Sequence, residues 1–587
     1  MKKKAISLLN NNICLSLMIN SFFLLLVILF CDMKYEVSDD FIMDSVLSGA
    51  YGNGYDEHLL FSNILLGYFL KGLYSITGSV SWYFIGHIFV CYISLCTISY
   101  VILENSGKIY GILICFIFVS FFSDDLYILV QFTKTATAAT CAGGIFIIHQ
   151  LWVNNRRRLW GIMYGFALAL IGTMIRFQCV YIVAVFLFIM FLEYIIKYSI
   201  DKSKIVDLIK KICVCIVMLL LMVFVNRVNI NIWNQNSIYG EYMKFSSTRA
   251  SVVDVLGYGY ESVEEEFGKI GLTLTDYCMI DSWNIVDRDY FTDEKLHYIS
   301  DVKKKCSNLV NHDIATIVDV LYNRKYIGYT IFWGCVLLWI LKSWRYKQAI
   351  AINTIKVLAA FSFVIYFIYR GRVVYRVDYS ILFCLAATIG CSTLYKERNY
   401  KCKWIFPLVV LLIVCKIPLY IPDTNYIYMD DREYQQYIYN CFIESWNFNI
   451  KKYRCNVSKR KPHENLINMM MSDDENYYLV DFATGIQLLY YNYKPWKRIP
   501  SGYFQKYSYL GGVSMRYPDE IEVWKNKGID EVNPNKALIN DNIYVVDNSF
   551  KDTKMWYLRE KYYPAADVEI IDEVDGFYIL KYKKQED

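Results

Sequence analysis

The sequence predicts an all-α polytopic membrane bundle of about eleven transmembrane helices, followed by a small extracytoplasmic α/β domain at the C-terminus. Hydrophobic residues make up 56% of the 587-residue chain, and charged residues only 20%. The charges gather in clusters between long uncharged runs, whereas a soluble domain mixes charge along its surface. The 53 tyrosines and 35 phenylalanines suit many crossings of the membrane interface. The net charge of +5, without a long basic run, argues against nucleic acid as a partner.

About eleven uncharged or nearly uncharged runs are long enough, or nearly so, to cross the hydrocarbon layer as helices, which satisfy their own backbone hydrogen bonds there. They are residues 13–31, 81–102, 109–122, 126–150, 159–175, 177–196, 212–225, 326–341, 349–369, 377–394 and 404–421. The first run follows three lysines, as a signal peptide would. It is longer than the core of a signal peptide and lacks a small-x-small cleavage site, so we predict that it is retained as a helix.

The basic residues predict the orientation of these helices. If the N-terminus lies inside, the short inside loops hold most of the lysines and arginines, which is the positive-inside pattern. These loops are residues 156–158, 197–211, 342–347 and 396–403. The stretch 370–376, with three arginines, falls outside and is an exception.

The segment 59–77 decides the number of crossings, because it is apolar but carries Lys71. If this segment crossed the membrane, every later loop would invert and the arginines at 156–158 would lie outside. We therefore predict that it lies along the outer interface as an amphipathic helix.

This topology divides the chain into two domains. A transmembrane domain at 1–421 has outside loops at about 32–80 and 226–325, and an extracytoplasmic domain covers 422–587. Strand-like runs at 477–480, 543–546 and 577–582 predict the α/β character of the second domain.

The first outside loop carries the adjacent carboxylates Asp39 and Asp40. Such a carboxylate can accept a proton from a hydroxyl as a general base, and a pair can hold a divalent cation against a phosphate. The alternative is that both are solvated loop acids. Glu57 and His58, further along this loop, are candidate substrate-binding residues. No His or Cys spacing indicates a metal site, so a divalent cation at Asp39 and Asp40 is the one cofactor we consider.

Five basic residues are predicted to lie on the same face of the membrane as these acids. Ionisable groups at membrane depth are costly, so they usually pair with one another or line a functional cavity. Guanidinium groups there can grip a lipid phosphate through a bidentate fork. The alternative is that neighbouring aspartates pair with them. The five candidates are Lys134, Arg176, Arg370, Arg372 and Arg376.

The second outside loop combines acidic and aromatic residues. Carboxylates bond sugar hydroxyls, and aromatic rings stack on sugar C–H faces. The same composition suits an ordinary folded loop. The residues are Arg249, Asp254, Asp276, Asp281, Trp283 and Asp287.

Together, an N-in first helix, an acidic first outside loop with an interfacial helix, many further helices and a C-terminal outside domain resemble the GT-C superfamily. These are membrane glycosyltransferases that use polyprenyl-phosphate sugars. The segment from Ser38-Asp39-Asp40-Phe41 through Ser48-Gly49-Ala50-Tyr51-Gly52 looks like the first loop of uncharacterised bacterial members. The resemblance covers roughly residues 1–420 and leaves out the C-terminal domain.

The resemblance implies an inverting transferase at the outer face of a bacterial cytoplasmic membrane. It would move a sugar from a polyprenyl-phosphate donor to a cell-envelope acceptor, either a glycan or a lipid. Asp39 and Asp40 match the place of the family's first-loop acid, with Asp40 as the expected base. The match to the family's acidic pair and following aromatic is approximate, which leaves open which carboxylate is catalytic. The basic residues would hold the donor phosphate.

Two other functions fit such a chain. A polysaccharide polymerase of O-antigen type also has many helices and outside arginines, but uses a lipid-pyrophosphate glycan and does not depend on a first-loop acid. A lipid-linked glycan flippase or other transporter would spread charged residues across several mid-membrane helices. Here the charges cluster toward one face.

Overall fold

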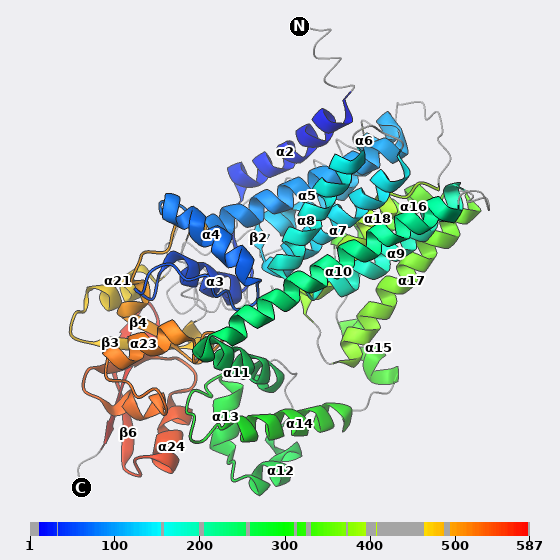
Figure 1. Ribbon diagram of the computed structural model, residues 1–587. Helices are drawn as coiled ribbons and strands as arrows, with labels where there is room; N and C mark the ends of the chain where they lie inside the picture. The colour runs from blue at the N-terminus through cyan, green and yellow to red at the C-terminus, as the bar shows by residue number, and fades with distance from the viewer. Residues whose placement is uncertain are drawn as a thin grey trace.

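The computed structural model describes residues 11–31, 33–153, 158–198, 205–253, 259–309, 314–323, 330–344, 346–370, 374–394, 407, 463–485 and 494–584. Within these residues the chain forms a helical bundle and a smaller body with a five-stranded sheet (Figure 1). Each of the first ten predicted apolar runs contains a helix of the bundle. The last, 404–421, lies outside the described residues except for residue 407.

The bundle helices run in both directions along one common axis (Figure 1). They are α2 (Asn12–Phe30), α5 (Trp82–Ser106), α6 (Lys108–Tyr127), α7 (Phe132–Trp152), α8 (Arg158–Ile175), α9 (Cys179–Tyr198), α10 (Ile205–Gln235), α16 (Thr330–Ser343), α17 (Lys347–Tyr369) and α18 (Tyr375–Gly390). Seven helices of the described chain are long and apolar enough to cross a membrane. The protein is therefore a multi-pass membrane protein, and the count of eleven crossings stays a prediction.

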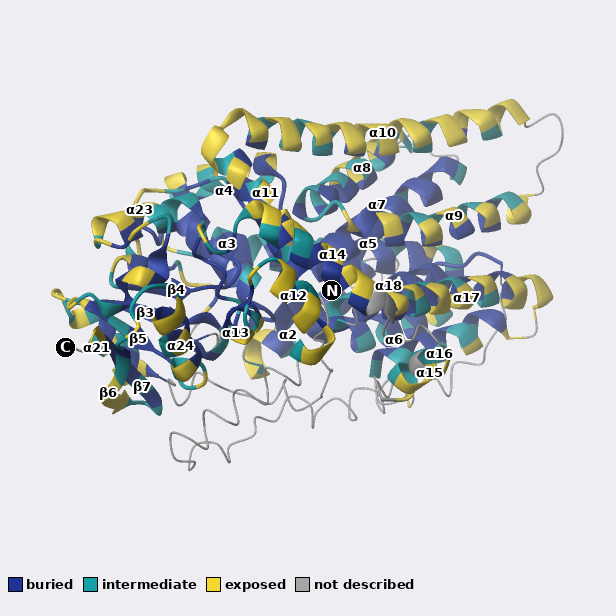
Figure 2. Ribbon diagram, turned by 90° about the horizontal axis from the view of Figure 1, so that it is seen from below, coloured by how far each residue is buried: buried dark blue, intermediate teal, exposed yellow. Residues whose placement is uncertain are grey.

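Burial distinguishes the centre of the bundle from its periphery. Helix α7 is buried along almost its whole length, while α10 exposes apolar side chains such as Leu220 and Phe224 (Figure 2). A soluble protein rarely exposes such a continuous apolar surface, so α10 faces lipid. Helix α7 is instead surrounded by other helices and does not face lipid. Its threonines and Lys134 can therefore find polar partners inside the bundle.

The predicted interfacial segment forms α4 (Ile64–Ile76). Its 13 residues span about 20 Å, which is too short to cross about 30 Å of hydrocarbon. The Asn63 backbone N–H donates to the Met174 carbonyl at 2.7 Å, and its side chain donates to the Val225 carbonyl at 3.2 Å. Helix α4 therefore lies against α8 and α10 at the end of the bundle that faces the C-terminal body. We call this end the domain end.

The two loops that the sequence predicts to lie outside contain helices. The first contains α3 (Ser38–Ser48), with strand β1 (Lys34–Tyr35) before it pairing in parallel with β2 (Leu129–Val130). The second contains α11 (Ser237–Val253), α12 (Glu264–Lys269), α13 (Leu274–Asp281), α14 (Asp293–Leu309) and α15 (Ile314–Asn323).

The C-terminal body is the predicted α/β unit. Its sheet has the order β4-β3-β5-β7-β6, in which β3 is parallel to β4 and β5, while β7 is antiparallel to β5 and β6. The three predicted strand runs correspond to β3, β5 and β7. The elements are α21 (Glu464–Ser472), β3 (Tyr477–Asp481), β4 (Tyr507–Leu510), α23 (Pro518–Asn526), β5 (Ile543–Val546), α24 (Lys551–Lys561), β6 (Ala566–Val574) and β7 (Phe577–Lys584).

Both of these loops pack against the α/β unit. In the first loop, the Gly49 carbonyl accepts from the Gly502 N–H at 3.1 Å. In the second, Lys561 forms an ion pair with Asp276 at 2.8 Å, and Asp287 accepts from the Asn535 N–H at 3.0 Å. These two aspartates, considered above as sugar ligands, therefore join the second loop to the C-terminal unit.

Candidate functional site

The candidate site lies at the domain end, around the start of the central helix α7. Helix α3 places Asp39 and Asp40 in its first turn, and the pairing of β1 with β2 ties this loop to the end of α6. Asp40 accepts from the backbone N–H of Phe132 at 3.0 Å and from the Tyr83 hydroxyl at 2.9 Å, both through Oδ1. Asp40 thus holds the first residue of α7.

The second carboxylate oxygen of Asp40 is buried and has no hydrogen-bond partner among the described residues. Burial raises the pKa of Asp40 well above its ordinary value, although the bonds from Tyr83 and Phe132 oppose this shift. Asp39 differs because it is only partly buried. The charge of Asp39 also reaches Tyr242 on α11, where it adds to the larger effect of burial in raising the pKa of that hydroxyl.

Arg176 lies in the turn between α8 and α9, at the same end of the bundle. Its Nη1 donates to the Thr133 hydroxyl at 2.8 Å, and its Cζ lies 4.7 Å from the centre of the Phe132 ring. Asp40 and Arg176 therefore contact the first two residues of the same helix. The sequence predicts that an acid near residue 40 and a cation near residue 176 share one face, and the structure brings them together.

Lys134 is at the same end but engaged by carboxylates. Its ammonium group is fully buried and pairs with Glu36 at 2.5 Å and with Asp125 at 3.0 Å. Asp125 also accepts from the Tyr375 hydroxyl. Two carboxylates thus neutralise the charge of Lys134. Lys134 therefore follows the alternative that the sequence left open, in which a basic residue pairs with a neighbouring aspartate instead of binding a lipid phosphate. We assign Lys134 to holding α6, α7 and the first loop together.

The remaining predicted arginines lie between α17 and α18. Arg370 is exposed at the end of α17, and Arg372 lies outside the described residues. Arg376, in the first turn of α18, is partly buried. The Thr137 hydroxyl bonds Ser380 at 3.1 Å, which aligns α7 with α18. Arg376 lies one turn before Ser380, so it is at the level of Thr133, the residue that Arg176 contacts.

Glu57 and His58 contact other elements than the start of α7: Glu57 contacts α4, and His58 contacts α11. Glu57 pairs with Lys71 of α4. His58 Nδ1 lies 2.6 Å from Asp56 Oδ1, and its ring stacks on Tyr239 at 3.7 Å. Burial opposes the ionisation of Asp56, but His58 and two tyrosine hydroxyls outweigh it and lower the pKa of Asp56 to about 2.

Asp56, Glu57 and His58 are the one group among the described residues whose ligand atoms are close enough to hold a metal ion together. All three atoms lie within 4.8 Å of one another. Each side chain already has a protein partner, however. The expected position for a cation, Asp39 with Asp40, does not form such a group in the described structure.

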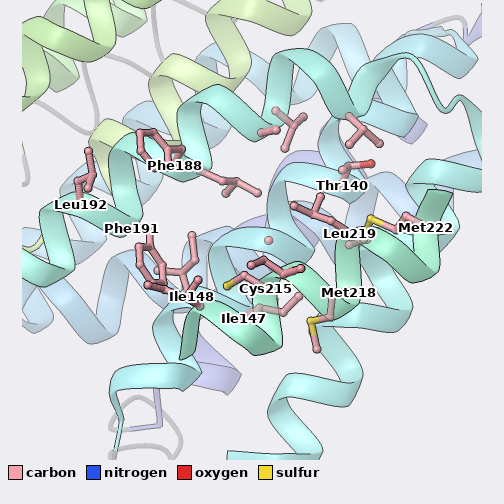
Figure 3. A pocket seen from close by; sticks show the side chains of 18 of the residues that line it. Thr140, Ile147, Ile148, Phe188, Phe191, Leu192, Cys215, Met218, Leu219 and Met222 are labelled. Atoms are coloured by element: carbon pink, nitrogen blue, oxygen red, sulfur yellow. The ribbon is translucent and has the colours of Figure 1, made fainter. Parts of the chain in front are cut away.

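An apolar groove runs beside the site, between α7, α8, α9 and α10 (Figure 3). Its volume is about 430 Å³. Thr140 and Met222 lie toward one end of the groove, and Phe191 and Leu192 lie toward the other (Figure 3). Thr140 is the only residue with a hydroxyl among those that line it. The sequence did not predict this groove, because an apolar run shows that a helix meets lipid but not where two helices separate.

A second, polar pocket of about 860 Å³ lies between α11 and the C-terminal unit. Tyr239 and Asp519 line it; the Tyr239 hydroxyl donates to Asp56 at 2.7 Å and lies 3.4 Å from Asp519 Oδ1. Burial, together with the charge of Asp56, raises the pKa of Asp519 to about 7. The sequence did not predict this pocket either, since its walls come from segments that lie far apart in the chain.

Comparison with known proteins gives no relative: no family model, no curated protein and no solved structure matches the chain. Only the site itself therefore bears on the function.

Proposed function

We propose that the protein transfers a sugar from a polyprenyl-phosphate donor to an acceptor at the outer face of a bacterial cytoplasmic membrane. One observation carries this proposal. Asp40, next to Asp39, contacts Phe132 and Arg176 contacts Thr133 at the start of α7, and an apolar groove begins about two helical turns further along that helix, at Thr140. A carboxylate, a cation and a lipid-chain site are the three groups that such a transfer requires.

The donor would bind with its chain in the groove and its phosphate on Arg176. Val180 lines the groove four residues after Arg176, just inside α9, and Thr140 lines it two turns after Thr133. The guanidinium group of Arg176 therefore lies near the end of the groove at the domain end. Arg376, at the same level, is the candidate for a second phosphate contact.

The chemistry needs a base and a stabilised leaving group. The acceptor hydroxyl gives its proton to a first-loop carboxylate, and its oxygen attacks the anomeric carbon from the face opposite the phosphate. The bond between that carbon and the phosphate oxygen breaks, and polyprenyl phosphate leaves with the electron pair. Arg176 stabilises the charge that develops on the phosphate. Asp39 is the accessible carboxylate, while Asp40 positions the loop on α7.

Replacing Arg176 with alanine tests the phosphate site. We expect the Kd for polyprenyl phosphate to rise about 10- to 100-fold, because a hydrogen bond to a charged group contributes about 1.5–3 kcal/mol. Binding of polyprenol, which lacks the phosphate, should not change. Arg158→Ala is the matched control, since Arg158 begins α8 at the opposite end. The assignment of Arg176 to the phosphate would be contradicted if Arg176→Ala weakened the binding of both lipids equally. It would also be contradicted if the binding of polyprenyl phosphate did not weaken.

Filling the groove tests the lipid-chain site separately. Ala184 lines the groove, whereas its neighbour Val185 is exposed on the outer face of α9. We expect Ala184→Trp to raise the Kd for polyprenyl phosphate about tenfold or more, because each buried CH₂ that is displaced costs about 0.8 kcal/mol. Val185→Trp is the control. Geranyl phosphate, with its short chain, should bind both variants with the same Kd. If Ala184→Trp did not change the Kd for polyprenyl phosphate, the polyprenyl chain would bind outside the groove.

A reconstituted assay separates this function from the two alternatives. Purified protein in vesicles should transfer labelled sugar from a polyprenyl-phosphate sugar. A polymerase would instead require a lipid-pyrophosphate glycan, and a flippase would move the lipid without breaking its sugar bond. Either result would replace the proposed function.

A further inference from the structure

Helix α15 is the last helix of the second predicted outside loop, and it carries a row of exposed apolar side chains. Ile314, Val318 and Tyr322 are 81%, 55% and 77% exposed. They lie on one side of the helix, because side chains at i and i+4 stand above one another. Single exposed apolar residues are common on the surface of soluble proteins, whereas an apolar row along a whole helix indicates a partner.

The other two sides of α15 have different surroundings. Ile317, Val320 and Leu321 pack against the buried core of the bundle, where the helix lies against α17 (Figure 1). Ala315 and Asp319 lie on the third side and are exposed. At 3.6 residues per turn, the apolar row falls between the side that contacts protein and the side that carries the acidic residue. The row is therefore separate from the protein core.

The neighbouring helix α17 shows what covers this part of the molecule. It is one of the described helices that are long and apolar enough to cross a membrane. Leu358 and Phe361 are exposed along its length, and Tyr366 and Tyr369 are exposed at its end. In a helix that crosses a membrane, such side chains face lipid. Because α15 packs against α17, it lies beside a surface that lipid covers.

Exposed aromatic residues mark the level of the membrane interface at this end of the bundle. A short connection joins α16 to α17, so the start of α16 and the end of α17 lie at the same end. The end of α17 leads to α18, whose start is level with that of α7, so this is the domain end. Trp333, in the first turn of α16, is exposed, as are Tyr366 and Tyr369 of α17. Tryptophan and tyrosine concentrate where hydrocarbon meets the headgroups, and Tyr322 of α15 adds a further exposed ring.

We propose that α15 lies in the membrane interface at the domain end, with Ile314, Val318 and Tyr322 inserted among the lipids. The side that carries Asp319 then faces water. The ten residues of α15 are too short to cross about 30 Å of hydrocarbon, so the helix lies in the plane of the interface. Its partner is the lipid surface, which it recognises through acyl chains, because the inserted row contains no charged residue. This inference does not depend on the proposed function.

Photo-crosslinking of the full-length protein in phosphatidylcholine vesicles tests the lipid contact. Benzoylphenylalanine, whose ketone reacts with nearby C–H bonds, replaces Val318 in one variant and the adjacent Asp319 in the matched control. A third variant carries it at Phe361 of α17 as the reference for lipid contact. The phosphatidylcholine carries a tritium-labelled acyl chain. We expect the Val318 variant to link at least about fivefold more labelled lipid than the Asp319 variant, because the apolar side of an interfacial helix is buried about 5–10 Å into the acyl boundary.

Two results would overturn the proposal. One is that the variants at Val318 and Asp319 link equal amounts of labelled lipid. The other is that the Val318 variant links to a second copy of the chain instead of lipid, so that the row is a contact between protomers. Thermal midpoints show that each variant is folded, and Tyr322, which is also exposed, provides a second position if the Val318 variant does not fold.

Discussion

Replacing Asp39 with asparagine should reduce the rate of sugar transfer by about 10²- to 10⁴-fold, the usual contribution of a positioned general base. The amide has nearly the same shape but cannot accept the acceptor's proton. Asp39 is partly exposed and lies in the first turn of α3, close enough to Tyr242 to influence its hydroxyl. Initial rates in vesicles with a labelled polyprenyl-phosphate sugar measure the effect. The Kd for polyprenyl phosphate should stay unchanged, because Arg176 is untouched.

Asp40→Asn is the matched variant for this experiment. An amide oxygen can still accept from Phe132 and Tyr83, so the start of α7 should keep its place. We expect a smaller loss of transfer than with Asp39→Asn. A larger loss would move the role of base to Asp40, whose second oxygen is buried without a partner in the described structure. If both variants transferred sugar at the normal rate, neither carboxylate would be catalytic.

Replacing Lys554 with methionine should lower the free energy of unfolding of the C-terminal unit by about 3–5 kcal/mol, the usual cost of removing one partner from a buried ion pair. Lys554 is fully buried and pairs with Asp481 at 2.6 Å and Asp547 at 2.5 Å, at the carboxyl ends of β3 and β5. Without the ammonium group, two neighbouring carboxylates remain buried. The thermal midpoint of the full-length protein, followed by tryptophan fluorescence, measures the loss.

The loss should depend on pH in a defined direction. Burial already raises the pKa of Asp481 to about 6, against the opposing charge of Lys554. Removing Lys554 raises this pKa further, so the folded variant binds more protons than the unfolded chain, and its stability falls as pH rises from about 4 upward. Lys583→Met, which breaks the exposed pair with Glu569, is the control and should have little effect. If the loss of stability in Lys554→Met did not become smaller toward acidic pH, the charges of the two buried carboxylates would not be its cause.

The site was only partly predictable from the sequence. Arg176 and Lys134 occur within long apolar runs of the sequence. This unusual position identified both as candidate phosphate-binding residues. The structure shows that their environments differ, since Arg176 contacts Thr133 while two carboxylates enclose Lys134. Glu36, which completes that enclosure, lies about a hundred residues away in the chain. No local pattern distinguishes a lysine with such a partner from one without.

The sequence by itself determined the bundle helices and three strands of the C-terminal sheet. Its uncharged runs specified the bundle helices, and its strand-like runs specified β3, β5 and β7, because hydrophobicity and alternation are local properties of a chain. Only the tertiary structure decided which polar groups face one another, where α9 and α10 leave a groove, and that α11 and the C-terminal unit enclose a second pocket. Those features depend on how separate segments of the chain pack against one another. Packing is set by the shapes and charges of whole surfaces rather than by neighbours in the chain.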